Sequence, residues 1–168
     1  GFMIRCLVRS PRKLEGRTWA SNPGVEIRQA DLGDSRSLAG NLAGCETAFY
    51  LVHSMTSAGA AYTNKDRHLA LQFASAAKEG GVGRIIYLGG LGEGSAHLAS
   101  RHATAETLRA GDVPVAYFRA AAVIGGGSES FRTVFYLVRR LPVMVTPRWV
   151  TTRTQPIAVG DAVGFLAD

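Results

Sequence analysis

The sequence predicts an α/β fold with a mainly parallel β-sheet. Four short apolar runs support this prediction, and they lie at residues 3–8, 47–52, 84–88 and 114–118. Each run is rich in β-branched or aromatic residues, and helix-length segments separate the runs. Strands that alternate with helices are typical of crossover connections between parallel strands. Ligands of such sheets bind beyond the carboxyl ends of the strands, so the first candidate site residues are those that follow the runs: Arg9, His53, Gly89 and Arg119.

Local signals place the elements in the first part of the chain. Pro11 cannot extend a central strand and therefore forces a turn after the first run. Residues 25–30 alternate in polarity like a further strand, and Ser35 is suited to cap a short helix. That helix is expected to carry Leu38, Ala39 and Leu42.

Two longer helices are predicted in the middle of the chain. Helical spacing places four apolar residues of the first helix on one face, and Gly80–Gly81 ends it: Leu69, Phe73, Ala76 and Ala77. The second helix is expected to run from about His97 to Arg109 and to end before Gly111.

Residues 120–168 are less regular. A turn at 125–127 is expected to lead to an amphipathic helix with Phe131, Phe135, Val138 and Leu141, followed by extended pieces at 143–145 and 155–159. The glycines would let residues 125–128 act as a mobile lid, with an ordinary turn as the alternative. Four aromatic residues are expected either to line an apolar pocket or to belong to the core: Phe131, Phe135, Tyr136 and Trp149.

Composition favours one globular domain over residues 1–168. The chain is 46% hydrophobic and 19% charged, which is ordinary for a globular protein. It has neither the ~18 consecutive apolar residues of a transmembrane helix nor a secretory leader, so a cytoplasmic location is expected. Cys6 and Cys45 suggest neither a disulfide framework nor a metal cluster, and buried free thiols are expected.

The formal net charge of +6 indicates an anionic partner. The basic residues are spread along the chain and form no periodic stripe, and no helix-turn-helix or aromatic-basic platform accompanies them. A phosphate-bearing small ligand or nucleotide therefore fits better than a nucleic acid. The sequence does not indicate an oligomeric state.

Six segments together resemble a known family: LVRS at 7–10, ADLGD at 30–34, FYLVH at 49–53, IYLGG at 86–90, FRAA at 118–121 and QPIAV at 155–159. They are similar to the atypical short-chain dehydrogenase/reductase group, in particular its NmrA-like and sugar-nucleotide-epimerase-like NAD(P)-binding members. The resemblance implies a Rossmann-like, doubly wound sheet. It also implies that residues 1–119 form a nucleotide-binding core and residues 120–168 a substrate-side part.

The same resemblance implies that the chain is truncated at its N-terminus. Its first run corresponds to the family's second strand, so the first strand, a Gly-x-x-Gly-x-x-Gly turn and a helix would precede Gly1. In a doubly wound sheet that first strand lies centrally. We therefore expect two separate half-sheets, and a chain that binds no cofactor is one alternative.

The resemblance assigns cofactor contacts to residues near the strand ends. Arg9, with Ser10 and Arg12 close behind, stands where an arginine accommodates the 2′-phosphate of NADP, so NADP(H) is expected over NAD(H). A solvated basic turn is the alternative. Asp31 would accept a hydrogen bond from the adenine amino group and Leu32 would close on the ring, with an N-cap or Asx turn as the alternative for Asp31.

Further contacts are expected at the ends of the later strands. The resemblance places Leu51, Val52 and His53 against the adenosine and pyrophosphate, and His53 could instead be a hydrogen-bonding or packing residue. It places Gly89 and Gly90 at the position of the family's catalytic serine, and Arg119 at the nicotinamide end.

The usual catalytic set of the family is replaced in this chain. Members use a serine and a Tyr-x-x-x-Lys helix, whereas the matching positions here read Gly89–Gly90, His97 and Arg101. A spacing of four places His97 and Arg101 on one helical face. Histidine could donate a proton and arginine could bond a ribose hydroxyl, or both could simply occupy an exposed face.

Three functions are consistent with these residues. The first is an NADPH-dependent oxidoreductase acting on a small carbonyl or enone compound. The second is a catalytically silent dinucleotide-binding regulator or assembly subunit, which the replaced catalytic residues favour. The third is a basic interaction module that needs no nucleotide.

Overall fold

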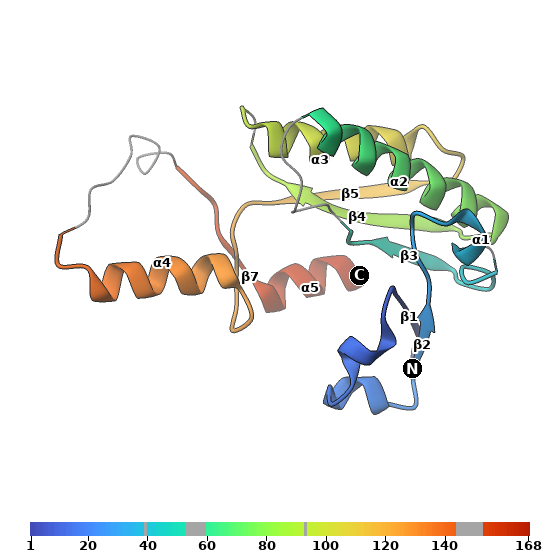
Figure 1. The fold of residues 1–168 in the computed structure, drawn as a ribbon, viewed down its shortest axis with the longest axis horizontal. Helices are drawn as coiled ribbons and strands as arrows, with labels where there is room; N and C mark the ends of the chain where they lie inside the picture. Colours follow the sequence, from blue (N-terminus) through green and yellow to red (C-terminus); the bar gives the residue numbers. More distant parts are fainter. Residues whose placement is uncertain (39, 53–59, 93, 144–152) are drawn as a thin grey trace.

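A computed structural model describes residues 1–38, 40–52, 60–92, 94–143 and 153–168 of the chain. Its architecture is α/β, with parallel strands and helices that pack on them (Figure 1). The predicted fold class is therefore confirmed.

The first two strands form a parallel pair. β1 (Ile4–Val8) lies beside β2 (Val25–Gln29), with Ile4 opposite Val25 and Val8 opposite Gln29. Two short 3-10 helices connect them, η1 (Pro11–Leu14) and η2 (Thr18–Ser21). Pro11 begins η1, as the predicted turn requires, because its fixed φ suits the first turn of a helix.

The next three strands form a second parallel sheet in the order β3–β4–β5. These strands are β3 (Thr47–Tyr50), β4 (Arg84–Gly90) and β5 (Val115–Ala120). Helices α2 (Ala60–Glu79) and α3 (Ala96–Arg109) lie together on one side of this sheet (Figure 1). Tyr50, Ile85 and Leu108 are among the side chains buried between sheet and helices.

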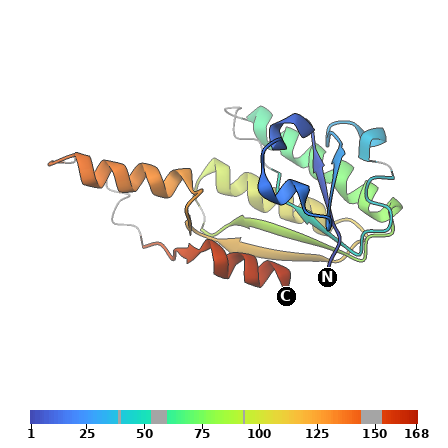
Figure 2. The same cartoon turned by 90° about the horizontal axis from the view of Figure 1, so that it is seen from below.

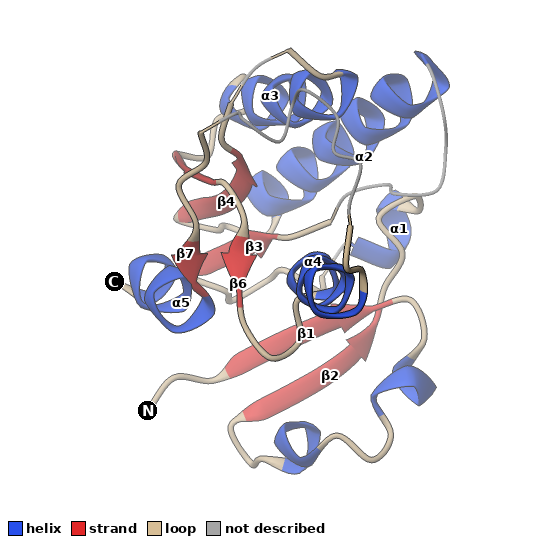
Figure 3. Ribbon diagram, turned by 90° about the vertical axis from the view of Figure 1, so that its left-hand side faces the viewer, coloured by secondary structure: helices blue, strands red, loops and turns tan. Residues whose placement is uncertain are grey.

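The two sheets are separate units. No ladder joins β1 to β3 in the part of the chain that the structure describes, so the two half-sheets expected from the sequence are present. The β1–β2 pair lies away from α2 and α3, beyond the β3–β4–β5 sheet (Figure 3). Apolar residues at these strand edges remain exposed: Ile4 by 54%, Phe49 by 46% and Leu51 by 56%.

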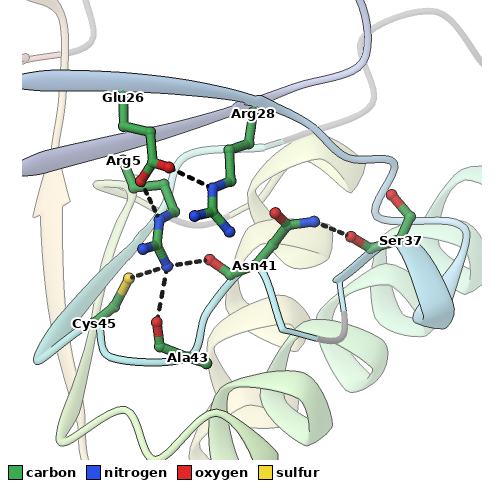
Figure 4. Close-up of polar contacts among 7 residues, drawn as sticks. All are labelled: Arg5, Glu26, Arg28, Ser37, Asn41, Ala43 and Cys45. Carbon is green, nitrogen blue, oxygen red and sulfur yellow. Dashed lines mark hydrogen bonds and ion pairs between the residues drawn. The ribbon is translucent and has the colours of Figure 1, made fainter.

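Arg5 connects the two units (Figure 4). Its Nε donates to Glu26 Oε2 of the neighbouring strand at 2.8 Å. Its Nη1 donates to the carbonyl oxygens of Asn41 at 2.9 Å and Ala43 at 2.8 Å, and contacts Cys45 Sγ at 3.5 Å. One guanidinium therefore links β1 and β2 to the segment that leads into β3. Cys6 and Cys45 are free thiols, but both are half-buried rather than buried.

The end of α2 follows from its two glycines. Gly81 has φ +72°, a conformation in which a residue without Cβ is preferred. The N–H of Gly81 donates to Lys78 O, and the N–H of Val82 donates to Ala77 O. These two bonds form a Schellman motif, which confirms the predicted stop at Gly80–Gly81.

The helix predicted at Ser35 is shorter than expected. α1 covers Ser35–Leu38, so Ser35 is its first residue, and the Asp34 carbonyl accepts the first helical bond from Leu38 N. Leu42 lies beyond the helix because Gly40 turns the chain at φ +75°. Leu38 and Leu42 are nevertheless both buried, as their apolar character predicts. Ala39 lies outside the described residues.

The C-terminal region forms a small unit of its own. β6 (Val123–Ile124) pairs in parallel with β7 (Ile157–Ala158), and α5 (Val159–Ala167) follows. The extended piece predicted at 155–159 is therefore shorter, because Val159 already begins α5. Residues 125–128 form a turn closed by Ser128 N to Gly125 O.

α4 (Glu129–Arg140) projects away from the sheets in two perpendicular views (Figures 1 and 2). Ser128 caps it by accepting a hydrogen bond from Phe131 N at 3.3 Å. Its aromatic residues do not lie in the core, because Phe131, Phe135 and Tyr136 are 41–46% exposed. Trp149 and residues 144–145 lie outside the described part.

Within the described residues, none of the helices combines the length and the apolar character needed to cross a bilayer.

Replacing Arg5 with Ala tests the link between the two units. We expect the free energy of unfolding to fall by about 1–2 kcal/mol, because the charged donor serves two backbone carbonyls as well as Glu26. Urea denaturation at pH 7 measures the change. Arg28→Ala is the matched control, since Arg28 also pairs with Glu26 but is 39% exposed against 22% for Arg5. An equal loss in both variants would contradict the prediction.

Candidate functional site

The candidate catalytic pair lies at the start of α3. Ser95 caps this helix by accepting a hydrogen bond from Leu98 N at 3.2 Å. His97 and Arg101 follow one turn apart, and Arg101 Nε donates to His97 Nε2 at 3.1 Å. The structure thus brings together the two residues that the sequence placed on one face. Because a guanidinium only donates, this bond assigns the lone pair to Nε2 and the proton of neutral His97 to Nδ1.

Gly89 and Gly90 let other groups approach the end of β4 closely. A Cβ on Gly90 would lie 2.5 Å from Leu98 Cδ2 and 3.4 Å from Arg101 Cδ. A Cβ on Gly89 would lie 2.6 Å from Tyr117 Cε2 and 2.8 Å from its hydroxyl oxygen. The two glycines therefore allow the first turns of α3 and the Tyr117 ring to pack against the strand end.

Tyr117 and His102 form a second pair in this site, which sequence reasoning missed. The Tyr117 ring stacks on Tyr87 at 5.3 Å between centroids, and its hydroxyl lies 3.0 Å from His102 Nδ1. His102 Nε2 lies 3.1 Å from the carbonyl oxygen of Gly92. Since a carbonyl only accepts, Nε2 carries the proton, and the Tyr117 hydroxyl donates to Nδ1.

Burial keeps the tyrosines of the site in their protonated form. Burial raises the pKa of Tyr87 to about 12. It also raises the pKa of Tyr117, against the opposing effect of three nearby cations: Arg119, Arg101 and Arg109. Arg109 lies over the Tyr117 ring, 5.4 Å from its centroid. The phenol groups are therefore hydrogen-bond donors at neutral pH.

The predicted phosphate-binding residues lie on the other half-sheet. Arg9 follows β1 and is exposed, and its guanidinium has no hydrogen bond or ion pair to any residue that the structure describes. Only its carbonyl is engaged, by Gln29 Nε2 at 3.2 Å. Ser10 and Arg12 follow at the start of η1, where Ser10 makes no side-chain cap. An anion could therefore reach Arg9 without breaking a contact.

Asp31 and Leu32 have structural roles after β2. Asp31 Oδ1 accepts from Gly33 N at 2.9 Å, which is the Asx turn left open as an alternative. Leu32 is partly buried and packs against the hydrophobic core. The Asp31 side chain remains exposed, so its turn-forming role leaves the carboxylate within reach of solvent.

The remaining predicted residues border the ends of β3 and β5. Leu51 and Val52 follow β3 and are 56% and 45% exposed, while His53 lies outside the described residues. Arg119 is exposed and stands opposite Gly89 in the register of β4 and β5. Apart from the three residues after β3, the predicted residues form two groups: Gly89, Gly90, His97, Arg101 and Arg119 around β4 and β5, and Arg9, Ser10, Arg12, Asp31 and Leu32 around β1 and β2.

A family comparison adds to this geometry. The sequence model of a protein family described as NAD(P)H-binding matches residues 1–126. The chain belongs to this NAD(P)H-binding family. The match covers every strand from β1 to β6, and therefore both groups of predicted residues.

Solved structures of similar fold include oxidoreductases and a dehydratase. Triphenylmethane reductase of Citrobacter sp., complexed with NADP(H), aligns over 71% of this chain and 40% of its own, with 23% identity and a TM-score of 0.59. NADPH-dependent quinone oxidoreductase of Escherichia coli aligns over 72% and 40%, with 23% identity and a TM-score of 0.59. A dTDP-glucose 4,6-dehydratase of Streptomyces venezuelae aligns over 88% and 55%, with 16% identity and a TM-score of 0.69.

These likenesses establish the fold. The predicted Rossmann-like character is confirmed, and the chain spans between 40% and 55% of the length of these three proteins. No curated protein matches the sequence.

Gly89→Ala tests the close packing of Tyr117 on the strand end. The new Cβ would overlap the Tyr117 ring, so we expect a loss of about 1–3 kcal/mol in the free energy of unfolding. Thermal unfolding followed by circular dichroism measures it. Gly126→Ala is the control, because open space surrounds that position and its φ is not positive. If both variants unfold at the same temperature, the packing described here is wrong.

Proposed function

We propose that this chain is part of an NADPH-preferring oxidoreductase that acts on a small carbonyl or enone compound in the cytoplasm. The observation that carries the cofactor preference is Arg9, an exposed guanidinium at the carboxyl end of β1 with no partner among the described residues. In this division of the chain, residues 1–119 bind the nucleotide and residues 120–168 face the substrate.

The residues present fit the ribose-phosphate side of a dinucleotide. A guanidinium binds a dianionic 2′-phosphate through parallel hydrogen bonds, and Arg12 adds a second positive charge. Asp31, exposed beside them, can still accept a hydrogen bond from the adenine amino group through its second carboxylate oxygen. The same cofactor is named for two proteins of similar fold, the reductases of Citrobacter sp. and Escherichia coli.

The β4–β5 group would hold the reacting end. NADPH, when bound, supplies a hydride to the substrate. His97 carries its proton on Nδ1 and can donate a hydrogen bond to a substrate oxygen, which polarises the carbonyl, while its Nε2 stays bonded to Arg101. Arg101 remains charged and can bond a ribose hydroxyl as well as orient His97. Arg119, across from Gly89, would frame the nicotinamide end of the site.

A catalytically silent regulator or assembly subunit is the second candidate function. The residues at the family's catalytic positions favour it, because Gly89 and Gly90 carry no hydroxyl and His97 and Arg101 replace the tyrosine and lysine. In this alternative the chain binds the dinucleotide without turnover, and the same arginines select NADPH.

Arg9→Ala tests the cofactor preference. We expect the dissociation constant for NADPH to rise about 10–100-fold and that for NADH to stay unchanged, because only NADPH carries the 2′-phosphate. Titration of NADPH fluorescence measures both constants. Arg67→Ala removes an exposed arginine of α2 and should change neither constant. Equal affinities of the unaltered chain for NADPH and NADH would refute the preference.

His97→Ala distinguishes an enzyme from a regulator. For an oxidoreductase we expect NADPH oxidation with a panel of carbonyl and enone compounds to fall at least about 100-fold while NADPH binding is retained. His68→Ala, which removes an exposed histidine of α2, should leave turnover unchanged. Bound NADPH without turnover in the unaltered chain, across the whole panel, would instead support the regulator.

A further inference from the structure

Helix α4 is exposed on every side. All residues from Phe131 to Arg140 are exposed, and the helix projects away from the sheets (Figures 1 and 2). Helical spacing places five apolar side chains of α4 and its C-cap, each 41–59% exposed, in one stripe along the helix: Phe131, Val134, Phe135, Val138 and Leu141. A continuous apolar stripe left in water indicates a contact surface.

The net charge of the chain is concentrated in the segment that contains α4. The rest of the chain holds fourteen basic and thirteen acidic side chains, so it contributes only one of the six net positive charges. Residues 130–160 hold five arginines and no aspartate or glutamate: Arg132, Arg139, Arg140, Arg148 and Arg153. Three of these arginines belong to α4. The charge therefore favours an anionic partner for this helix.

The three arginines of α4 lie outside the apolar stripe. Helical spacing places Arg132 and Arg139 along one border of the stripe and Arg140 on the opposite side of the helix. Arg139 Cζ lies 5.3 Å from the centroid of the Phe135 ring, and Arg140 Cζ lies 5.4 Å from that of Tyr136. Arginine side chains can cover an apolar surface with their stems while the charged head stays in a polar layer. Charge and apolar surface are thus separated across the helix.

We propose that α4 docks on the surface of a bilayer that contains anionic phospholipids. The apolar stripe would enter the boundary between headgroups and acyl chains, and the arginines would bind lipid phosphates. With 12 residues, α4 is about 18 Å long, so it would lie along the interface and not cross a hydrocarbon core of about 30 Å. The inference goes beyond the proposed function, because neither group of candidate site residues lies on α4.

A lipid surface fits both features of α4 better than other partners do. A nucleic acid would pair with the arginines but leave the apolar stripe in water. A second copy of the chain could cover the stripe, but it would bring like charges together, since residues 131–143 contain no carboxylate to pair with them. An acidic protein would need a groove shaped to the stripe and carboxylates beside it, whereas an anionic bilayer offers both layers to any helix of this pattern.

Co-sedimentation with unilamellar vesicles tests the inference on the unaltered chain. We expect partitioning onto phosphatidylcholine vesicles with about one third phosphatidylglycerol to exceed that onto pure phosphatidylcholine about 10–100-fold. Raising the ionic strength from about 0.05 M to about 0.5 M should weaken it, because salt screens exposed charges. Hydrogen exchange in α4 should slow on the anionic vesicles. Equal partitioning onto both kinds of vesicle, or none onto either, would overturn the inference.

An arginine variant assigns the charged part of the binding to α4. Replacing the three α4 arginines with Gln should lower partitioning onto anionic vesicles at least about 10-fold. The matched control replaces three exposed basic residues elsewhere, Arg17, Lys65 and Arg67, with Gln and should lower it much less. Circular dichroism checks that both variants fold, as expected for changes at exposed side chains. An equal loss in both would assign the binding to overall charge and so contradict the inference.

An apolar variant tests the stripe. Phe135→Ser should lower partitioning about 10-fold, because a large apolar side chain no longer enters the bilayer. Leu71→Ser removes a comparably exposed apolar side chain from α2 and should leave partitioning unchanged. Binding that survives Phe135→Ser would be purely electrostatic, against the inference. Self-association in sedimentation velocity that Phe135→Ser abolishes, without any vesicle binding, would identify a second copy of the chain as the occupant instead.

Discussion

The structure depends on one guanidinium that joins two sheets. Without a ladder between β1 and β3, backbone hydrogen bonding cannot hold the β1–β2 pair in place among the described residues. Arg5 replaces that ladder with charged hydrogen bonds to Glu26 and to two backbone carbonyls before β3. Such bonds are directional, so they fix the orientation of the pair as well as its presence. The position of Arg9 relative to the β4–β5 group follows from these bonds together with the packing of Leu7 and Ala30 in the hydrophobic core.

At the end of β4, close packing rather than hydrogen bonding holds the neighbouring elements in place. Gly90 lets Leu98 and Arg101 approach β4, and Gly89 leaves room for the Tyr117 ring. The loss of side chains at these two positions is therefore compensated by groups from α3 and β5. His97, Arg101, His102 and Tyr117 converge on a strand end that carries no functional group itself.

Periodicity and turn signals predicted the elements that depend on local chemistry. The strands at β1 to β5, α2 with its Gly80–Gly81 stop, and α3 all form where the sequence placed them, within a few residues. The pairing of His97 with Arg101 was also predictable, because it depends on helical spacing alone. The predicted length of α1 was too great. The apolar pattern continues to Leu42, but the helix ends earlier because Gly40 turns the chain in the left-handed conformation.

Contacts between elements could not be read from the chain in the same way. Tyr117 meets Gly89 across neighbouring strands, and it meets His102 from another element, so no sequence spacing signals either contact. A usable hint was present, since Tyr117 stands two residues before Arg119 and so shares its face of β5. The exposure of the α4 aromatics was equally hidden, because helical spacing predicts an apolar face but not what covers it.

Among the described strands, β4 is the one with partners on both sides. Its amide protons are held in two ladders, whereas the outward amides of β1 and β3 face no partner strand. Hydrogen exchange follows local opening, so protection is greatest where both neighbours must separate. We therefore expect β4, whose end carries Gly89 and Gly90, to exchange more slowly than β1, whose end carries Arg9. The two groups of candidate residues would then differ in rigidity.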